Sequence, residues 1–136
     1  MRFKQVKEKN RMRFLPTLAG AAHPTFERFV MDTMANANPA YKGGYWDFIE
    51  FPNGAKAMIL PGESKSKIQI RQQANGFSGS MSPTSLSIAL NISACSYLSF
   101  HTVGPTQRAL SKNYHLLRET LDSELFDTKE IFRFLD

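Results

Sequence analysis

The sequence is short of cysteine, of long apolar runs and of acidic charge. Its one cysteine, Cys95, cannot form an internal disulfide, and the apolar residues around it predict a buried thiol rather than a nucleophile. No window approaches the roughly 20 apolar residues that cross a bilayer, and the N-terminus has no apolar signal-peptide core. We therefore predict a cytoplasmic protein that neither enters a membrane nor is exported.

The shortage of acidic residues excludes a protein that mimics DNA. The chain has 12 Asp and Glu against 17 Lys and Arg, whereas a DNA mimic needs a surface dense in carboxylates. The whole net charge of +5 resides in residues 1–13, and the rest of the chain carries equal numbers of basic and acidic side chains. We predict a basic, flexible arm over residues 1–12 and a single domain over residues 13–136. Such an arm is either a solvated leader or a contact for nucleic-acid phosphates.

Patterns typical of catalysis are also missing. His23, His101 and His115 are not at metal-ligand spacing, and one cysteine cannot complete a zinc set. No GxSxG-type elbow marks a nucleophile. Asp47 and Glu50 are three residues apart in an alternating segment, which places them on opposite faces of a strand. We predict no metal site, no cofactor and no enzymatic activity.

Helical periodicity accounts for much of the chain. Apolar residues that recur every three or four positions, with prolines suited to the first turn, predict several helices. One of them is apolar around most of its circumference, which predicts a buried central helix capped by Ser82. Around Pro16, in contrast, we predict an extended segment, because proline disfavours a helix interior. The predicted helices cover residues 24 to 36–38, 83 to about 100, 106 to about 126, and a short segment after Asp127.

The segment YKGGYWDFIEFPNG, residues 41–54, combines an alternating aromatic run with a turn signal. Asn-Gly readily adopts the positive φ angles of a tight turn, so residues 45–51 and 55–60 predict an antiparallel hairpin. Both faces of the first strand are largely apolar. The strand is therefore either covered on two sides, or covered on one side and used for binding on the other. We expect Tyr45 or Trp46 to pack the sheet against the central helix.

The segment NGFSGSMS, residues 75–82, places two glycines around an aromatic residue, directly before the central helix. A glycine-rich turn at a helix start can bind phosphate, but this one has no Lys or Arg and matches neither common phosphate-binding motif. In the structural alternative, Gly76 and Gly79 permit positive φ angles while Phe77 and Met81 fill the core. In both interpretations the segment is a turn.

These elements predict the fold class. Residues 67–71 alternate cleanly and predict a third, half-exposed strand. With the hairpin and the helices, they predict a single α+β domain, in which a small antiparallel sheet of about three to four strands packs with about four helices.

Three motifs resemble the ArdB/KlcA antirestriction family: RFLPTL at residues 13–18, YKGGYWDF at 41–48 and NGFSGSMS at 75–82. They stand in the family's order over a similarity that runs from about residue 11 to about residue 100. The resemblance implies an α+β protein of plasmids, phages or other mobile elements that protects incoming DNA from host type I restriction enzymes. It also implies a protein that is neither a nuclease nor a DNA mimic, and whose partner is the restriction complex or a host factor that controls it. The resemblance does not indicate whether the protein is a monomer or an oligomer.

A protein that acts without chemistry needs a contact surface. Two of the motifs supply our candidate binding residues, which combine aromatic and small polar side chains. An alternative function is a small DNA-binding accessory protein that uses the basic arm. The candidate binding residues are Tyr45, Trp46, Asp47, Asn75, Phe77 and Ser78.

Overall fold

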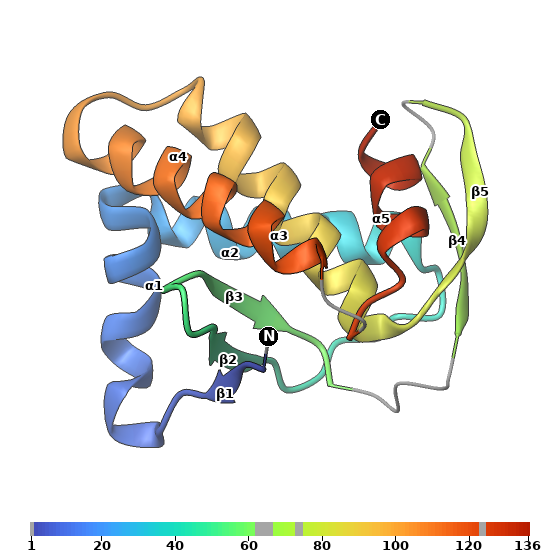
Figure 1. The fold of residues 1–136 in the computed structure, drawn as a ribbon, viewed down its shortest axis with the longest axis horizontal. Coiled ribbons are helices and arrows are strands. Elements are labelled where there is room, and N and C mark those ends of the chain that lie inside the picture. The colour runs from blue at the N-terminus through green and yellow to red at the C-terminus, as the bar shows by residue number, and fades with distance from the viewer. Residues whose placement is uncertain (1, 62–66, 73–74, 123–124) are drawn as a thin grey trace.

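The apolar segment after Ser82 forms helix α3 (Pro83–Ser99), around which the other elements pack in the computed structural model (Figure 1). The structure describes residues 2–61, 67–72, 75–122 and 125–136. As predicted, Ser82 caps α3, because its Oγ accepts a hydrogen bond from the Ser85 N–H at 3.1 Å. Its own buried side chains include Leu86, Ile88, Ala89, Leu90, Ile92, Ala94 and Cys95.

Helices on several sides enclose α3. It contacts α2 (His23–Ala37), α4 (Gly104–Glu119) and α5 (Thr128–Leu135). The predicted helix to residue 126 ends earlier, at Glu119, and continues as a 3-10 turn over Thr120–Asp122. Within the described residues, helices and antiparallel strands together confirm the α+β class.

Helix α1 (Arg11–Ala19) contains Pro16, so the prediction of an extended segment there is wrong. Proline cannot donate a hydrogen bond to the carbonyl four residues earlier. That carbonyl belongs to Met12 in the first turn, and the Met12 side chain is 91 % exposed, so water can reach this end of the helix. The helix is held instead by its buried face, which carries Phe14 and Leu18.

A three-stranded sheet forms from β1 (Lys4–Gln5), β2 (Asp47–Glu50) and β3 (Lys56–Ile59), in that order. The β2–β3 hairpin is confirmed. Its turn closes with a hydrogen bond from the Phe51 N–H to the Ala55 carbonyl, and Gly54 has a φ of 92°. Both faces of β2 are covered, since Phe48 and Ile49 are buried.

The N-terminal segment is attached to this sheet and does not form the flexible arm that we predicted. Lys4 pairs with Glu50 across the β1–β2 ladder, and a 3-10 turn over Glu8–Asn10 leads into α1. The reason is the pair of apolar residues between the charges: Phe3 and Val6 pack against the core, and the Phe3 ring meets Phe51 edge-on at 5.5 Å.

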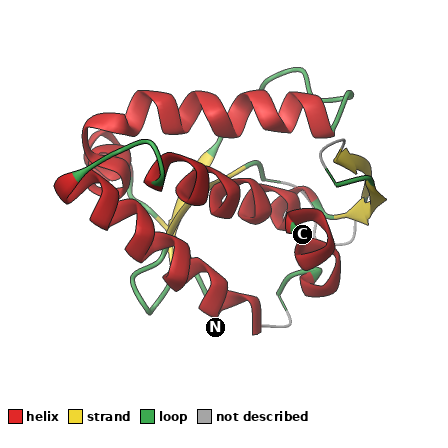
Figure 2. Cartoon of the chain, turned by 90° about the horizontal axis from the view of Figure 1, so that it is seen from above, coloured by secondary structure: helices red, strands yellow, loops and turns green. Residues whose placement is uncertain are grey.

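The second sheet pairs β4 (Ile68–Gln72) with β5 (Phe77–Met81). The predicted third strand is confirmed as β4, with Ile70 buried. NGFSGSMS, however, is mostly a strand and not a turn, because Phe77 and Met81 share one buried face at strand spacing. Gly76 has a φ of 73°, as predicted for a turn residue. Gly79 does not have the positive φ that we predicted. It is a glycine for a different reason, because a Cβ there would lie 2.7 Å from the Phe77 ring. Figure 2 shows this hairpin at one end of the molecule, beyond the helices.

Side chains from two helices complete the outer edge of β3, where another strand would otherwise pair. Asn91 of α3 accepts from the Met58 N–H at 3.0 Å and donates to the Met58 carbonyl at 2.7 Å. Asn113 of α4 bonds both backbone groups of Lys56 in the same way, at 2.8 and 2.9 Å. Ser87 Oγ accepts from the Leu60 N–H at 2.9 Å. We call Ser87, Asn91 and Asn113 the edge-capping residues; they satisfy backbone groups that a sheet edge leaves unpaired.

Candidate interaction surfaces

The six candidate residues lie in two separate places. Tyr45, Trp46 and Asp47 are at the start of β2, whereas Asn75, Phe77 and Ser78 belong to the β4–β5 hairpin. The two groups therefore belong to different sheets, and Figure 1 shows β4 and β5 at the right-hand edge of the fold, apart from β1, β2 and β3. The structure does not bring them together into one contact surface.

Trp46 is a core residue. It is 3 % exposed, and its Nε1–H donates to the Tyr41 hydroxyl at 3.0 Å. The two rings meet edge-on, with centroids 6.1 Å apart. The indole is therefore both buried and satisfied in hydrogen bonding, which is the usual state of a structural tryptophan.

Tyr45 points outward, with 64 % of its surface exposed. Its ring covers the guanidinium of Arg11, whose Cζ lies 4.7 Å from the Tyr45 centroid and 4.2 Å from that of Phe48. Arg11 Nη2 donates to the Trp46 carbonyl at 3.0 Å, while Nη1 is buried without a hydrogen-bond partner among the described residues. Two aromatic faces thus hold the cation. Of the first three candidates, Tyr45 is the most accessible.

The two acidic residues of β2 have different partners. Asp47 Oδ1 accepts a hydrogen bond from Gln5 Nε2 of β1 at 3.1 Å. Glu50 lies 3.9 Å from Lys56 Nζ of β3. The carboxylates therefore face different neighbours, as their spacing of three predicted, and do not form an acid–base pair.

Asn75 and Phe77 attach the C-terminal helix to the second sheet. Asn75 Nδ2 donates to the Phe134 carbonyl at 2.9 Å, at the end of α5, and Oδ1 accepts the Phe77 N–H at 3.0 Å. Phe77 is 6 % exposed and meets Phe134 edge-on at 6.0 Å. The side chains of Asn75 and Phe77 therefore stabilise the packing of α5 on the second sheet. Asn75 and Ser78 are both exposed, but the Asn75 amide is engaged in these hydrogen bonds.

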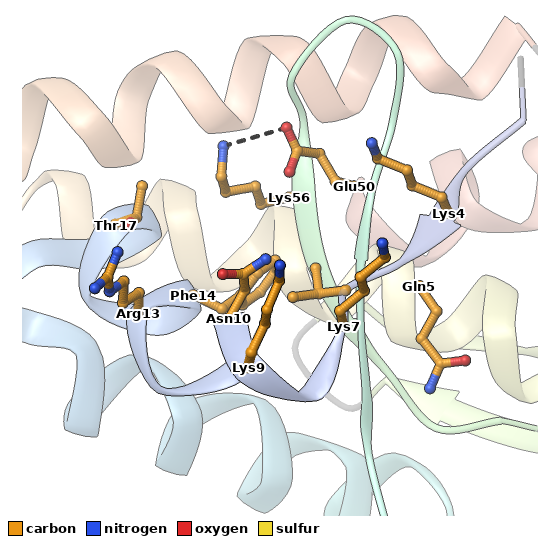
Figure 3. Close-up of a pocket in the computed structure, with 11 residues that line it drawn as sticks. Lys4, Gln5, Lys7, Lys9, Asn10, Arg13, Phe14, Thr17, Glu50 and Lys56 are labelled. Carbon is orange, nitrogen blue, oxygen red and sulfur yellow. Dashed lines mark ion pairs between the residues drawn. The ribbon is translucent and has the colours of Figure 1, made fainter.

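A basic cavity of about 430 Å³ lies where β1, α1 and the β2–β3 hairpin meet (Figure 3). We call it the N-terminal cavity. Its charged lining residues are Lys4, Lys7, Lys9, Arg13, Lys56 and Glu50. The lining also includes the polar residues Gln5, Asn10 and Thr17 and the buried ring of Phe14.

Four cations of this cavity have no acidic partner within the described part of the chain. Among the described residues, the ion pairs involve Lys56, Lys67 and Arg133, and none involves Lys4, Lys7, Lys9 or Arg13. The charge excess at the N-terminus signalled these residues in the sequence. What the sequence could not show is that they fold around a concave surface and that Lys56, more than forty positions away, joins them.

A second surface missed in the sequence is apolar. Tyr97, Phe100 and Val103, at the connection between α3 and α4, are 51 %, 84 % and 84 % exposed. Tyr97 and Phe100 were expected within the buried helix, but burial stops at Leu98, near the helix end. Tyr97 stacks between Phe29 and His101, with centroids 5.4 and 4.3 Å away.

The chemically reactive groups are otherwise inaccessible or dispersed. Cys95 is buried, as predicted; burial raises the pKa of its thiol to about 12, although a hydrogen bond from Asn113 opposes the shift. Across the part of the chain that the structure describes, His, Cys, Asp and Glu form no group of three that could hold a metal ion. No helix in that part has the length and apolar character needed to span a membrane.

Comparison with known proteins identifies relatives over nearly the whole chain. A family model described as "Antirestriction protein" matches residues 39–136. The antirestriction protein KlcA of Escherichia coli is 30 % identical, over 97 % of this chain and 91 % of KlcA. A solved structure of the KlcA and ArdB proteins covers 99 % of this chain and 94 % of its own, with a TM-score of 0.82 and 25 % identity. It is described as showing a novel fold and antirestriction activity against type I DNA restriction systems in vivo but not in vitro.

Proposed function

The chain belongs to the antirestriction protein family, and from this premise we propose that it protects incoming mobile-element DNA from host type I restriction endonucleases. The observation that carries the proposal is the extent of the similarity: sequence and fold agree with KlcA and its structural relatives over nearly the full chain. The predicted resemblance rested on three short motifs, and the agreement extends into α4 and α5, where those motifs are absent.

We further propose that protection requires neither catalysis nor imitation of DNA. The only thiol is buried, with its pKa raised to about 12, and thiol nucleophiles act as thiolates. Asp47 and Glu50 each have a separate partner. The net charge of +5 is opposite in sign to that of the phosphate array that a mimic has to reproduce.

The relative's activity in vivo but not in vitro bears on the partner. A protein that inhibits a restriction enzyme by binding it directly should also act when the two are mixed in purified form. We therefore favour a host factor that controls the restriction complex over the complex alone. Of the six candidate residues, Tyr45, Asn75 and Ser78 are exposed. Because the Asn75 amide already bonds the Phe134 carbonyl and the Phe77 N–H, we propose Tyr45 and Ser78 for such a contact.

The direct test is to plate unmodified phage on a strain that carries a type I restriction system, with and without this protein. We expect a higher plating efficiency when the protein is expressed, and no effect of the protein on phage that has already been modified. Equal plating efficiencies of unmodified phage in the two strains would refute the proposal. Variants Tyr45→Ala and Ser78→Ala then test the contact residues, with unchanged thermal unfolding as the control for folding.

A further inference from the structure

The N-terminal cavity concentrates positive charge that nothing in the described structure neutralises. Lys4 comes from β1, Lys7 and Lys9 flank the start of the 3-10 turn, and Arg13 comes from α1. All four side chains are exposed, and none has an acidic partner among the residues that the structure describes. Like charges gathered on one concave surface repel each other, and that repulsion is relieved when an anion binds between them.

The composition of the cavity indicates what kind of anion fits. Lysine is depleted from protein–protein interfaces, which are anchored by aromatic residues and arginine. Four of the five cations here are lysines, and the one aromatic ring in the lining, Phe14, is 4 % exposed and unavailable as an anchor. Gln5, Asn10 and Thr17 add amide and hydroxyl groups, which together with Lys and Arg are the usual contacts to phosphate oxygens.

The lining of the cavity also indicates which form of nucleic acid would fit it. Proteins that bind single strands stack successive bases on exposed aromatic rings. The lining of the N-terminal cavity offers no such ring, since Phe14 is buried. Its cations therefore match a phosphate backbone, which a duplex presents continuously and independently of sequence.

We propose that the N-terminal cavity binds the phosphate backbone of double-stranded DNA without sequence preference. This inference rests on the proposed function and extends it, because it places the protein on the substrate of the restriction enzyme. In this proposal the phosphates are contacted by Lys4, Lys7, Lys9 and Arg13. Lys56 does not contribute, because it forms an ion pair with Glu50.

Binding is measured by fluorescence anisotropy with a labelled 20-base-pair duplex and the complete protein, over a range of salt concentrations. Four phosphate contacts predict a slope of about −3 to −4 in log K against log salt, or roughly a 100-fold loss of affinity between 50 and 200 mM salt. Duplexes of unrelated sequence should bind equally, and a single strand of the same length should bind no more tightly. Absence of binding at 50 mM salt, or tighter binding of the single strand, would overturn the proposal.

The site is tested with the triple variant Lys7→Gln/Lys9→Gln/Arg13→Gln. None of the three side chains makes a hydrogen bond or ion pair with the described residues, so the fold should tolerate the change. We expect the salt slope to fall to about −1. The matched control, Lys42→Gln/Lys112→Gln/Lys129→Gln, removes the same charge from exposed positions outside the cavity and should keep most of the slope. Equal losses in the two triple variants would mean that overall charge, and not the cavity, attracts DNA.

The same variants separate this inference from the proposed function. If the wild-type protein protects phage and binds duplex DNA through the cavity, both hold. If it protects but does not bind DNA, the inference fails while the function stands. Should the triple variant then lose protection without any DNA binding by the wild type, the cavity serves an acidic protein partner instead. If the protein binds duplex DNA through the cavity but gives no protection, the DNA-binding site is supported and the proposed function is refuted.

Discussion

The replacement Asn91→Leu is the strongest test of how the sheet is held. Asn91 is fully buried, and its amide is the partner of both the N–H and the carbonyl of Met58, itself fully buried. Leucine fills a similar space but can neither donate nor accept. Each buried backbone group left without a partner costs about 1–3 kcal/mol, so the two groups predict a loss of roughly 2–6 kcal/mol. This is a large share of the ~5–15 kcal/mol that stabilises a typical domain.

The assay is urea unfolding followed by circular dichroism, with the free energy of unfolding obtained by linear extrapolation. Asn36→Leu is the control, because Asn36 is exposed on α2 and makes no hydrogen bond with the described residues through its side chain. We expect its effect to stay within about 0.5 kcal/mol. If Asn91→Leu costs less than about 1 kcal/mol with an unchanged m-value, the backbone of Met58 finds other partners. The edge-capping argument would then be refuted.

The other edge-capping residues predict a graded series. Ser87→Ala leaves one backbone donor, the Leu60 N–H, without its acceptor, and should cost about 1–3 kcal/mol. Asn113→Ala leaves both backbone groups of Lys56 without their partners, but the site is less deeply buried than that of Asn91. We therefore expect the loss for Asn113 to fall between the other two. Amide hydrogen exchange of Lys56, Met58 and Leu60 reports the same contacts one at a time.

Three further outcomes follow from buried or paired groups. Trp46→Ala should lower the free energy of unfolding by about 3–5 kcal/mol in urea, because the indole is 3 % exposed; unchanged stability with lost phage protection would instead place Trp46 at an interface. Cys95 should resist thiol reagents at pH 8 until the protein unfolds, since its pKa is about 12, and rapid labelling of native protein would contradict this. Partial burial opposes the shift, but the Ser82 N–H and Lys67 lower the pKa of Asp127 below its ordinary value. The ionised form of Asp127 therefore stabilises the fold at pH values above the ordinary pKa of the group. That contribution should disappear as pH falls through the lowered pKa, so thermal melts of wild type and Asp127→Asn should differ at pH 7 and converge in acid.

The parts of the fold that could be predicted were those in which local signals agree. For α3, apolar periodicity, the Ser82 cap and Pro83 in the first turn all indicate a helix, and the structure has one at the predicted start. The Asn53-Gly54 turn likewise specified the β2–β3 hairpin. In these segments tertiary contacts strengthen a preference that the local sequence already has.

The errors occurred where a local rule was outweighed by packing at a distance. Pro16 suggested an extended segment, but Phe14 and Leu18 bury one face of α1. The glycines of NGFSGSMS suggested a turn, yet Gly79 is needed because the Phe77 ring occupies the place of a Cβ. The charges of the N-terminus suggested a free arm, but Phe3 reaches the core. Among the candidate site residues, sequence alone could not tell that Trp46 is buried and Tyr45 exposed, because both faces of the strand looked alike.

Glu50 provides a test of the N-terminal cavity that does not depend on destroying it. The strand register places Glu50 opposite Lys4 in β1 and opposite Lys56 in β3. Among the described residues it is the one carboxylate in the lining. Its pair with Lys56 is long, at 3.9 Å, and the Glu50 and Lys56 side chains are 38 % and 23 % exposed. Exposed pairs of this kind contribute about 0–1 kcal/mol to stability, so Glu50→Gln should leave unfolding nearly unchanged.

The effect of Glu50→Gln on DNA affinity should be opposite in sign to that of the lysine variants. Losing the carboxylate removes a repulsion for phosphate and frees Lys56 as a fifth cation, so the salt slope should steepen by about 0.9 and affinity at low salt should rise. Glu119→Gln, on the exposed side of α4 and outside the cavity, is the control for net charge. A gain in affinity that is equal in the two variants would show a general charge effect. A loss of affinity in Glu50→Gln alone would mean that Glu50 positions Lys56 for binding, and that the ion pair does not hold it back.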